Sequence, residues 1–215
     1  MGGLIARHAA LLRTGQVLSL TLLSSGPGAI AGQRAAVLRE LLAILDPDEG
    51  RAGDDRDQLS ALVAQLWRDR LEPQARIDGT DEQIITFLCE RTHQTCPVGL
   101  IAMARYLLTC PDRTEELAVL TSAPAGGAGT DRPEADGGPG AAGLPVLVIY
   151  GEEDDAWPPE AQRRMARRLH AERACIPGAG HSPAVEAPDT TARLLTTFWN
   201  AAERRRASAS HPPRG

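Results

Sequence analysis

Lysine is absent from this chain of 215 residues, so all 23 basic residues are arginines, and aromatic residues make up only 3% of the sequence. Positive charge is also in deficit, because 28 acidic residues give a formal net charge of −5. A nucleic-acid-binding domain ordinarily carries a basic patch or stripe, and we therefore expect no nucleic-acid partner. Arginine in place of lysine, together with 21 glycines and 16 prolines, is typical of a GC-rich bacterial genome.

Cysteine is scarce, and the spacing of the cysteines does not match a common metal-binding motif. The intervals match neither a CxxC pair nor the usual arrangement of zinc ligands. The four residues are Cys89, Cys96, Cys110 and Cys175. We interpret them as unpaired thiols in a reducing compartment, which predicts a cytoplasmic protein that binds no metal through them.

Long apolar runs are missing as well. No segment approaches the 18 or so apolar residues of a membrane span, so we expect no membrane partner. The apolar run 17–23, followed by Ala29-Ile30-Ala31, shares features with a secretory signal. However, the run is short and contains Ser19 and Thr21, and we interpret it as a strand.

The hydrophobic pattern of the first 120 residues indicates one strand among helices. Apolar residues at helical spacing predict a helix over 2–14, and the run 17–23 predicts the strand. The sequence Ser24-Ser25-Gly26-Pro27-Gly28 then predicts a turn, because its glycines and proline interrupt regular structure. From 31 to about 120 the pattern is helical throughout, and its leucine-rich stripes are typical of packing between helices.

The remainder of the chain alternates strands and helices after a low-complexity segment. Residues 121–143 are nearly all small or polar and predict a flexible loop. Beyond it the pattern predicts a strand over 144–150, a helix over 158–169 and a strand over 174–176. A final helix is predicted from Pro188 onward. The first of these strands is a continuous Leu/Val/Ile run, which favours a parallel strand covered on both faces.

An acidic loop and a histidine loop follow the last two predicted strands. The segment Leu144 to Pro158 reads LPVLVIYGEEDDAWP, and Ile176 to Pro183 reads IPGAGHSP. Asp154 and His181 are 27 positions apart, which leaves room for one helix and one strand between them. Consecutive parallel strands end at the same edge of a sheet, where open α/β sheets bind ligands, so we expect this carboxylate and imidazole to meet there.

These segments resemble the acid and histidine segments of the α/β-hydrolase superfamily, and Met1-Gly2-Gly3 with the apolar helix after it resembles the second half of its nucleophile elbow. The resemblance covers residues 1–30 and 144–200 and implies an incomplete α/β-hydrolase fold, with about three parallel strands, flanking helices and a helical cap insertion. The implied organisation is an elbow helix and strand over 1–30, a helical cap over 31–120 and a flexible loop over 121–143. A C-terminal core over 144–203 and a disordered tail over 204–215 follow.

The resemblance also selects the acid and a donor to the oxyanion. In the family the acid lies three residues after the glycine that ends the strand and four before a proline, which favours Asp154 over Asp155, Glu152 and Glu153. His181 is implied as the base. The residue after the nucleophile helps to bind the oxyanion through its backbone N–H, which implies that role for Met1 in an intact member. The resemblance implies no metal and no organic cofactor.

A nucleophile is the missing component. The position before Met1 would hold the serine, and no Gly-x-Ser-x-Gly sequence occurs elsewhere in the chain. Dehalogenases and epoxide hydrolases use an aspartate nucleophile, usually followed by a bulky aromatic residue and then glycine, so Met1-Gly2-Gly3 favours serine. We therefore expect a hydrolase of an ester or related acyl compound with a Ser-His-Asp mechanism, inactive as this sequence stands. The alternative is a non-catalytic binding or partner module derived from the fold. Either way, an open sheet edge predicts self-association.

Overall fold

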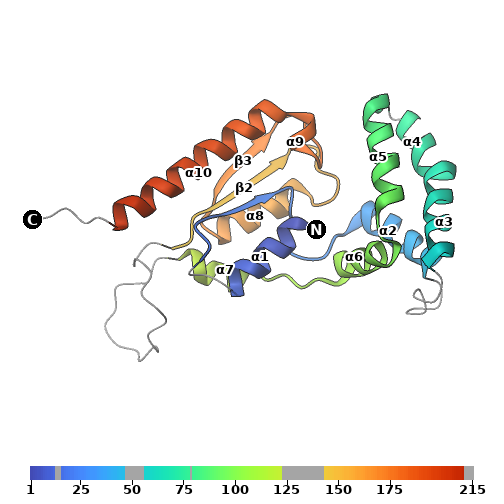
Figure 1. The fold of residues 1–215 in the computed structure, drawn as a ribbon. Helices are drawn as coiled ribbons and strands as arrows, with labels where there is room; N and C mark the ends of the chain where they lie inside the picture. Colours follow the sequence, from blue (N-terminus) through green and yellow to red (C-terminus); the bar gives the residue numbers. More distant parts are fainter. Residues whose placement is uncertain (13–15, 47–55, 78, 123–142, 211–215) are drawn as a thin grey trace, which may run out of the picture. The chain divides into compact units, whose positions relative to one another are not determined.

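The computed structural model describes residues 1–12, 16–46, 56–77, 79–122 and 143–210 (Figure 1). The chain divides into two compact units, one of Met1–Ala31 with Cys110–Gly215 and one of Gly32–Thr109. The elements are α1 (Gly2–Leu12), β1 (Leu20–Leu23), α2 (Gly32–Leu45), α3 (Arg56–Leu66), the π-helical turn η2 (Trp67–Leu71), α4 (Glu72–Ile77), α5 (Glu82–Gln94), α6 (Pro97–Thr109), α7 (Thr114–Thr121), β2 (Val146–Gly151), α8 (Pro159–Arg168), β3 (Glu172–Ile176), α9 (Pro183–Glu186) and α10 (Pro188–Ser210).

A three-stranded parallel sheet in the order β1-β2-β3 forms the centre of the first unit. Leu20 lies opposite Val146, and Gly151 lies opposite Ile176. Every residue of β2 is buried, which is the expected result for a Leu/Val/Ile run between two neighbouring strands and two helical layers. The predicted parallel sheet is therefore present.

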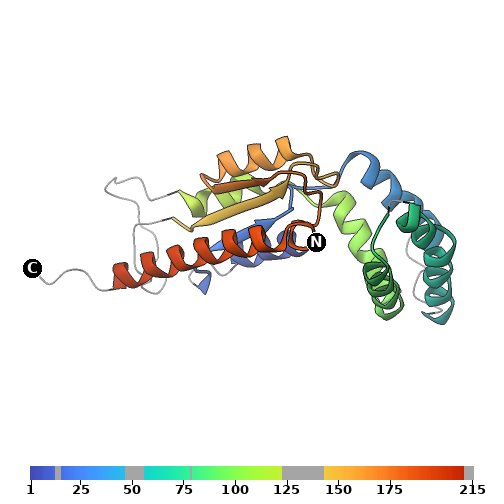
Figure 2. The ribbon, with the colours of Figure 1, turned by 90° about the horizontal axis from the view of Figure 1, so that it is seen from above.

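Helices cover both faces of this sheet, with α8 and α10 on opposite sides (Figure 2). On one face, Val148 and Tyr150 pack with residues of α1, α7 and α8 in a core that includes Leu117 and Met165. On the other, Leu147 and Ile149 pack with Phe198 and its neighbours on α10. Burying a side chain of this size contributes about 1.5–3 kcal/mol. Successive side chains of β2 are buried against opposite helical layers, so a shift of the strand by one residue would move each of them to the wrong face.

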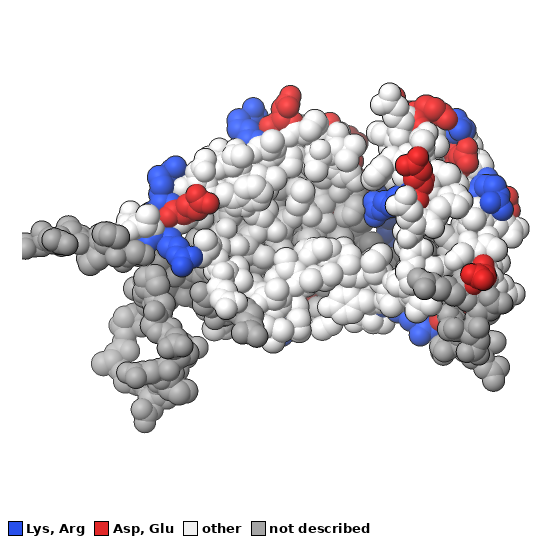
Figure 3. Space-filling view, viewed as in Figure 1, with Lys and Arg blue, Asp and Glu red and all other residues white. Residues whose placement is uncertain are grey.

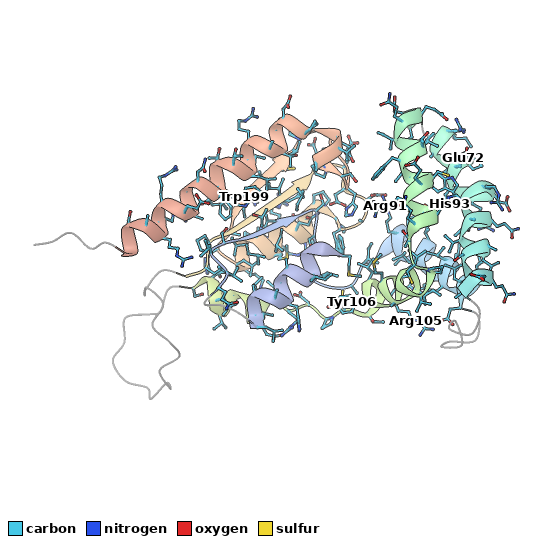
Figure 4. The ribbon with its side chains drawn as sticks, in the orientation of Figure 1. Glu72, Arg91, His93, Arg105, Tyr106 and Trp199 are labelled. Carbon is cyan, nitrogen blue, oxygen red and sulfur yellow. The ribbon has the colours of Figure 1, made fainter. Side chains whose placement is uncertain are left out.

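The second unit is entirely helical among its described residues. Leu45, Leu59, Val63 and Ile101 form its buried core. Asp46 follows α2 and is buried, and Arg105 of α6 donates a hydrogen bond to its carboxylate (Figure 4). The segments by which the chain leaves the first unit and returns to it lie close together. A Cβ on Gly28 would lie only 2.9 Å from the backbone nitrogen of Asp112.

The structure differs from the sequence-based boundaries at two places. The helical unit ends at Thr109, whereas the pattern extends the helical cap to 120, because Leu117 of α7 is fully buried in the first unit's core. Helix α10 continues to Ser210, which includes residues 204–210 of the expected disordered tail. Alanine and arginine favour helix, and this segment simply extends the helix before it. The predicted loop 121–143 lies outside the described residues, apart from its ends.

Strand β1 is an edge strand within the described part of the chain, since it pairs with β2 alone. Trp199 of α10 reaches it and donates a hydrogen bond of 3.1 Å from Nε1 to Thr21 Oγ1 (Figure 4). The side of the first unit seen in Figure 3 carries its charged residues mainly along α10 and is otherwise uncharged. None of the described helices combines the length and apolar character of a membrane span.

Candidate functional site

The loops that follow β2 and β3 are held together by backbone contacts. Gly151 closes β2, and a Cβ at this position would lie 2.1 Å from the carbonyl oxygens of both Ala179 and Gly180. The N–H of Glu152 donates a hydrogen bond of 3.0 Å to the carbonyl of Ile176. Because only glycine permits so close an approach, the acidic loop and the histidine loop lie against each other at the edge where the strands end.

Asp154 and His181 meet across this junction. Their Oδ1 and Nδ1 atoms are 3.0 Å apart. The Asp154 side chain is 0% exposed, whereas that of His181 is 31% exposed. One partner is thus sealed in the protein and the other retains access to solvent, which is the asymmetry required of an orienting acid and a base that exchanges protons.

The Asp154 carboxylate accepts hydrogen bonds from three further donors. Gln162 Nε2 donates to Oδ2 at 2.8 Å, and the amides of Ala156 and Trp157 donate to Oδ1 at 2.9 and 3.2 Å. Burial acts to raise the pKa of Asp154, but the hydrogen bonds from His181, Gln162 and the two amides outweigh it, so the pKa lies below its ordinary value. Asp154 is therefore an ionised acceptor at neutral pH.

The other three acidic residues of the loop have different surroundings. Glu152, Glu153 and Asp155 are exposed. Glu152 Oε2 accepts a hydrogen bond of 3.3 Å from the N–H of Gly178. Of the four carboxylates weighed from the sequence, Asp154 is the one that contacts the imidazole of His181.

Trp157 completes the surroundings of His181, and the sequence pattern did not indicate its role. Its ring centroid lies 5.8 Å from that of His181 at an interplanar angle of 44°. Its Nε1 donates a hydrogen bond of 3.1 Å to the carbonyl of Gly28. A Cβ on Gly26 would lie 1.9 Å from this indole, so the glycine is required by the contact. The turn after β1 therefore supports one side of the histidine.

Gln162 was also missed, because it lies among the arginines of α8, which read as a solvent-exposed face. It is fully buried, and its Nε2 binds both Asp154 and the carbonyl of Trp157. A single polar residue on a basic helix gives no signal of burial. The burial of Gln162 follows from the packing of α8 on the sheet, which the sequence does not show.

Met1 immediately precedes α1, whose first turn closes on it. The amides of Leu4 and Ile5 donate to the Met1 carbonyl at 2.9 and 3.3 Å. Burial lowers the pKa of the Met1 amino group. The Cys110 thiol acts to raise this pKa, and the guanidinium of Arg7 acts to lower it further. Figures 1 and 2 place this end of the chain at the sheet edge where the strands end. The N-terminus of α1 thus shares that edge with the Asp154–His181 pair.

The turn after β1 packs directly on this helix. A Cβ on Gly3 would lie 2.3 Å from Ser25 Oγ. Ser24 has a left-handed backbone with φ of 44°, which is uncommon for a residue other than glycine. Both serine hydroxyls are buried and have no hydrogen-bond partner among the described residues. The segment connects the start of α1 to the indole beside His181.

The site as described offers acid–base chemistry. Within the part of the chain that the structure describes, no three His, Cys, Asp or Glu side chains are grouped to hold a metal ion. An ionised carboxylate on Nδ1 fixes the imidazole tautomer, which leaves Nε2 to accept or donate a proton. The arrangement can therefore activate a hydroxyl placed on the Nε2 side.

Three solved structures illustrate what the fold is similar to. A thermophilic esterase from Thermogutta terrifontis is 17% identical, with a TM-score of 0.57, and the match covers 94% of this chain and 62% of that one. A carboxylesterase from Nitrososphaera gargenis is 17% identical, with a TM-score of 0.60 and coverage of 95% and 63%. MenH from S. aureus is 16% identical, with a TM-score of 0.59 and coverage of 94% and 65%.

The chain thus spans less than two thirds of the length of these structures, and at such identities the likeness concerns the fold. No curated protein sequence matches it. The three parallel strands with their flanking helices constitute an incomplete form of the shared fold. The sequence profile of the alpha/beta hydrolase family matches residues 1–194. With nine tenths of its length matched in this way, the chain belongs to the alpha/beta hydrolase family.

Proposed function

We propose that this chain contributes the acid and the base of a serine hydrolase that acts on an ester or related acyl compound. Asp154 orients His181, and His181 exchanges the proton. The contact of 3.0 Å between Asp154 Oδ1 and His181 Nδ1, with the carboxylate buried and the imidazole partly exposed, is the observation that carries this proposal.

The direction of proton transfer follows from the donors around Asp154. An ionised carboxylate cannot donate, so Nδ1 of His181 carries the proton and donates to Oδ1, and Nε2 is the basic nitrogen. His181 Nε2 removes the proton of the nucleophile during attack and returns it to the leaving group. Asp154 stabilises the imidazolium that exists between these two steps.

The nucleophile is proposed to be a serine that lies outside this sequence, next to Met1. Two features support that position. The chain has no Gly-x-Ser-x-Gly sequence, and α1 presents its N-terminus at the edge that holds His181. In the whole enzyme the N–H of Met1 would bind the oxyanion, helped by the positive end of the helix dipole.

The proposed substrate class is that of esters. Two of the structures with the same fold are an esterase and a carboxylesterase. The acyl transfer needs no group beyond a nucleophile, an oriented imidazole and oxyanion donors, so we propose that no metal or organic cofactor takes part. The protein is proposed to act on a small molecule in the cytoplasm.

Extension of the chain through the codons upstream of Met1 tests the proposal. If those codons encode Gly-x-Ser, the longer protein should hydrolyse p-nitrophenyl esters and react with a fluorophosphonate. His181→Ala and Asp154→Asn should each lower kcat by about 10³–10⁴, whereas the neighbouring Asp155→Asn should not. An upstream frame without such a serine, or a longer protein that no fluorophosphonate labels, would instead favour a non-catalytic partner module.

A further inference from the structure

A cavity separate from the acid–histidine pair lies on the α8 face of the sheet at its β3 edge. Its volume is about 430 Å³, within the usual range for small-molecule sites. The residues that line it are Tyr150, Pro159, Glu160, Arg163, Arg173 and Cys175. Tyr150 lies opposite Cys175 in the parallel register, and Arg173 is two residues before Cys175 on the same side of β3.

Hydrogen-bond donors dominate this cavity. Arg163 and Arg173 supply guanidinium groups, Tyr150 a phenol and Cys175 a thiol. Burial raises the pKa of Tyr150 and of Cys175, so both groups keep their protons at neutral pH. Arg163 already pairs with Glu160, but a guanidinium has five N–H donors, so a ligand rich in acceptors can bind several of these groups at once.

The phenol of Tyr150 is the most informative of these groups. Tyr150 is only 3% exposed and lines the cavity, so the little of this residue that is accessible faces the hollow. Its phenol supplies an O–H donor that a ligand in the cavity can reach. The cavity therefore has a phenol donor in its wall, alongside the arginine of α8 and the arginine of β3.

The opposing negative charges are largely neutralised. Glu160 is paired with Arg163, Arg164 and Arg167 of the same helix. Glu152 acts on the Cys175 thiol from the strand end, and its carboxylate accepts the N–H of Gly178. Arg173 has no ion-pair partner among the described residues and remains available. The lining thus carries two guanidinium groups and one carboxylate.

We propose that this cavity binds a small oxyanion, either a phosphate group or a carboxylate, between Arg163 and Arg173, with the Tyr150 hydroxyl as a third donor. Arginine matches both groups through two parallel N–H···O bonds. The site lies outside the acid–histidine pair and stands whether or not the chain takes part in ester hydrolysis.

Alkylation of Cys175 reports on occupation of the cavity in the full chain. Iodoacetamide, which is uncharged, is applied with inorganic phosphate or with acetate, and peptide mass spectrometry follows each cysteine. A ligand between the arginines should slow alkylation of Cys175 several-fold, and that of exposed Cys96 should not change. Isothermal titration calorimetry gives the affinity for each anion, and the tighter anion identifies the ligand group.

Arg173→Ala and Tyr150→Phe should each weaken binding at least several-fold, and Arg164→Ala, on the same helix but outside the lining, should not. Both test residues can be altered with little risk to the fold, since Arg173 is exposed and phenylalanine keeps the ring of Tyr150. Failure of both anions to protect Cys175 would overturn the proposal. Equal weakening by Arg164→Ala and Arg173→Ala would also overturn it, because it would indicate diffuse charge attraction.

Discussion

Trp157 and Gly28 are 129 positions apart, yet the indole Nε1 of Trp157 donates a hydrogen bond of 3.1 Å to the carbonyl of Gly28. The bond joins the acidic loop to the turn after β1, and the same indole flanks His181. The histidine therefore depends on a segment far away in the sequence for one of its walls.

Removal of this indole should destabilise the first unit. Trp157→Ala leaves a cavity beside Gly26 and an unpaired carbonyl, and we expect the free energy of unfolding to fall by about 3–5 kcal/mol. Trp157→Phe, which keeps part of the ring, should cost less. Urea unfolding followed by circular dichroism measures both. Trp199→Phe is the matched control, because Trp199 is exposed and its loss should cost under about 1 kcal/mol; an equal effect at both tryptophans would contradict the role of Trp157.

Asp154 should make stability depend on acid pH. Its pKa is lower in the folded chain than in the unfolded chain, so the unfolded state binds more protons as pH falls. The stabilisation is complete above the ordinary carboxyl pKa of about 4 and is lost as pH falls through the lowered folded value. Urea titrations between pH 6 and pH 2 should show a loss of stability that Asp154→Asn reduces. An unaltered slope in Asp154→Asn would refute the assignment of the lowered pKa.

Gly151→Ala should separate the two loops of the site. The added methyl group would meet the carbonyl oxygens of Ala179 and Gly180 at 2.1 Å, and backbone cannot move aside as a side chain can. We expect a loss of about 1–3 kcal/mol or more, together with loss of ester hydrolysis in the extended protein. Gly2→Ala is the control, since nothing lies within 4 Å of a Cβ there. A Gly151→Ala protein as stable as the Gly2→Ala protein would show that the loops can separate freely.

The open side of β1 should promote self-association. The amides of Leu20 and Ser24 donate to β2, so that of Thr21 points to the other side of the strand. An unpaired edge recruits another strand, and analytical ultracentrifugation should show a mass that rises with concentration. Thr21→Pro, which removes that donor, should reduce association more than Thr21→Ala. A monodisperse monomer at all concentrations would refute the expectation.

The sequence predicted the sheet well because its signals are local. The Leu/Val/Ile run of β2 is buried along its whole length, as its composition indicates. The proximity of Asp154 and His181 also followed from topology, since parallel strands must bring their ends together. In contrast, the burial of Gln162 and the position of α7 depend on packing with distant residues. The start of β1 at Leu20, three residues later than predicted, reflects its pairing with β2.

All the donors to the Asp154 carboxylate come from residues 156–181. The loop that must close to form the pair is thus short, and the entropy cost of closure grows only slowly with length. The acid and base can consequently assemble in one local folding step, when β2, α8 and β3 come together. The contacts of the Asp154 carboxylate are therefore independent of the sequence before β2, although the indole beside His181 is not.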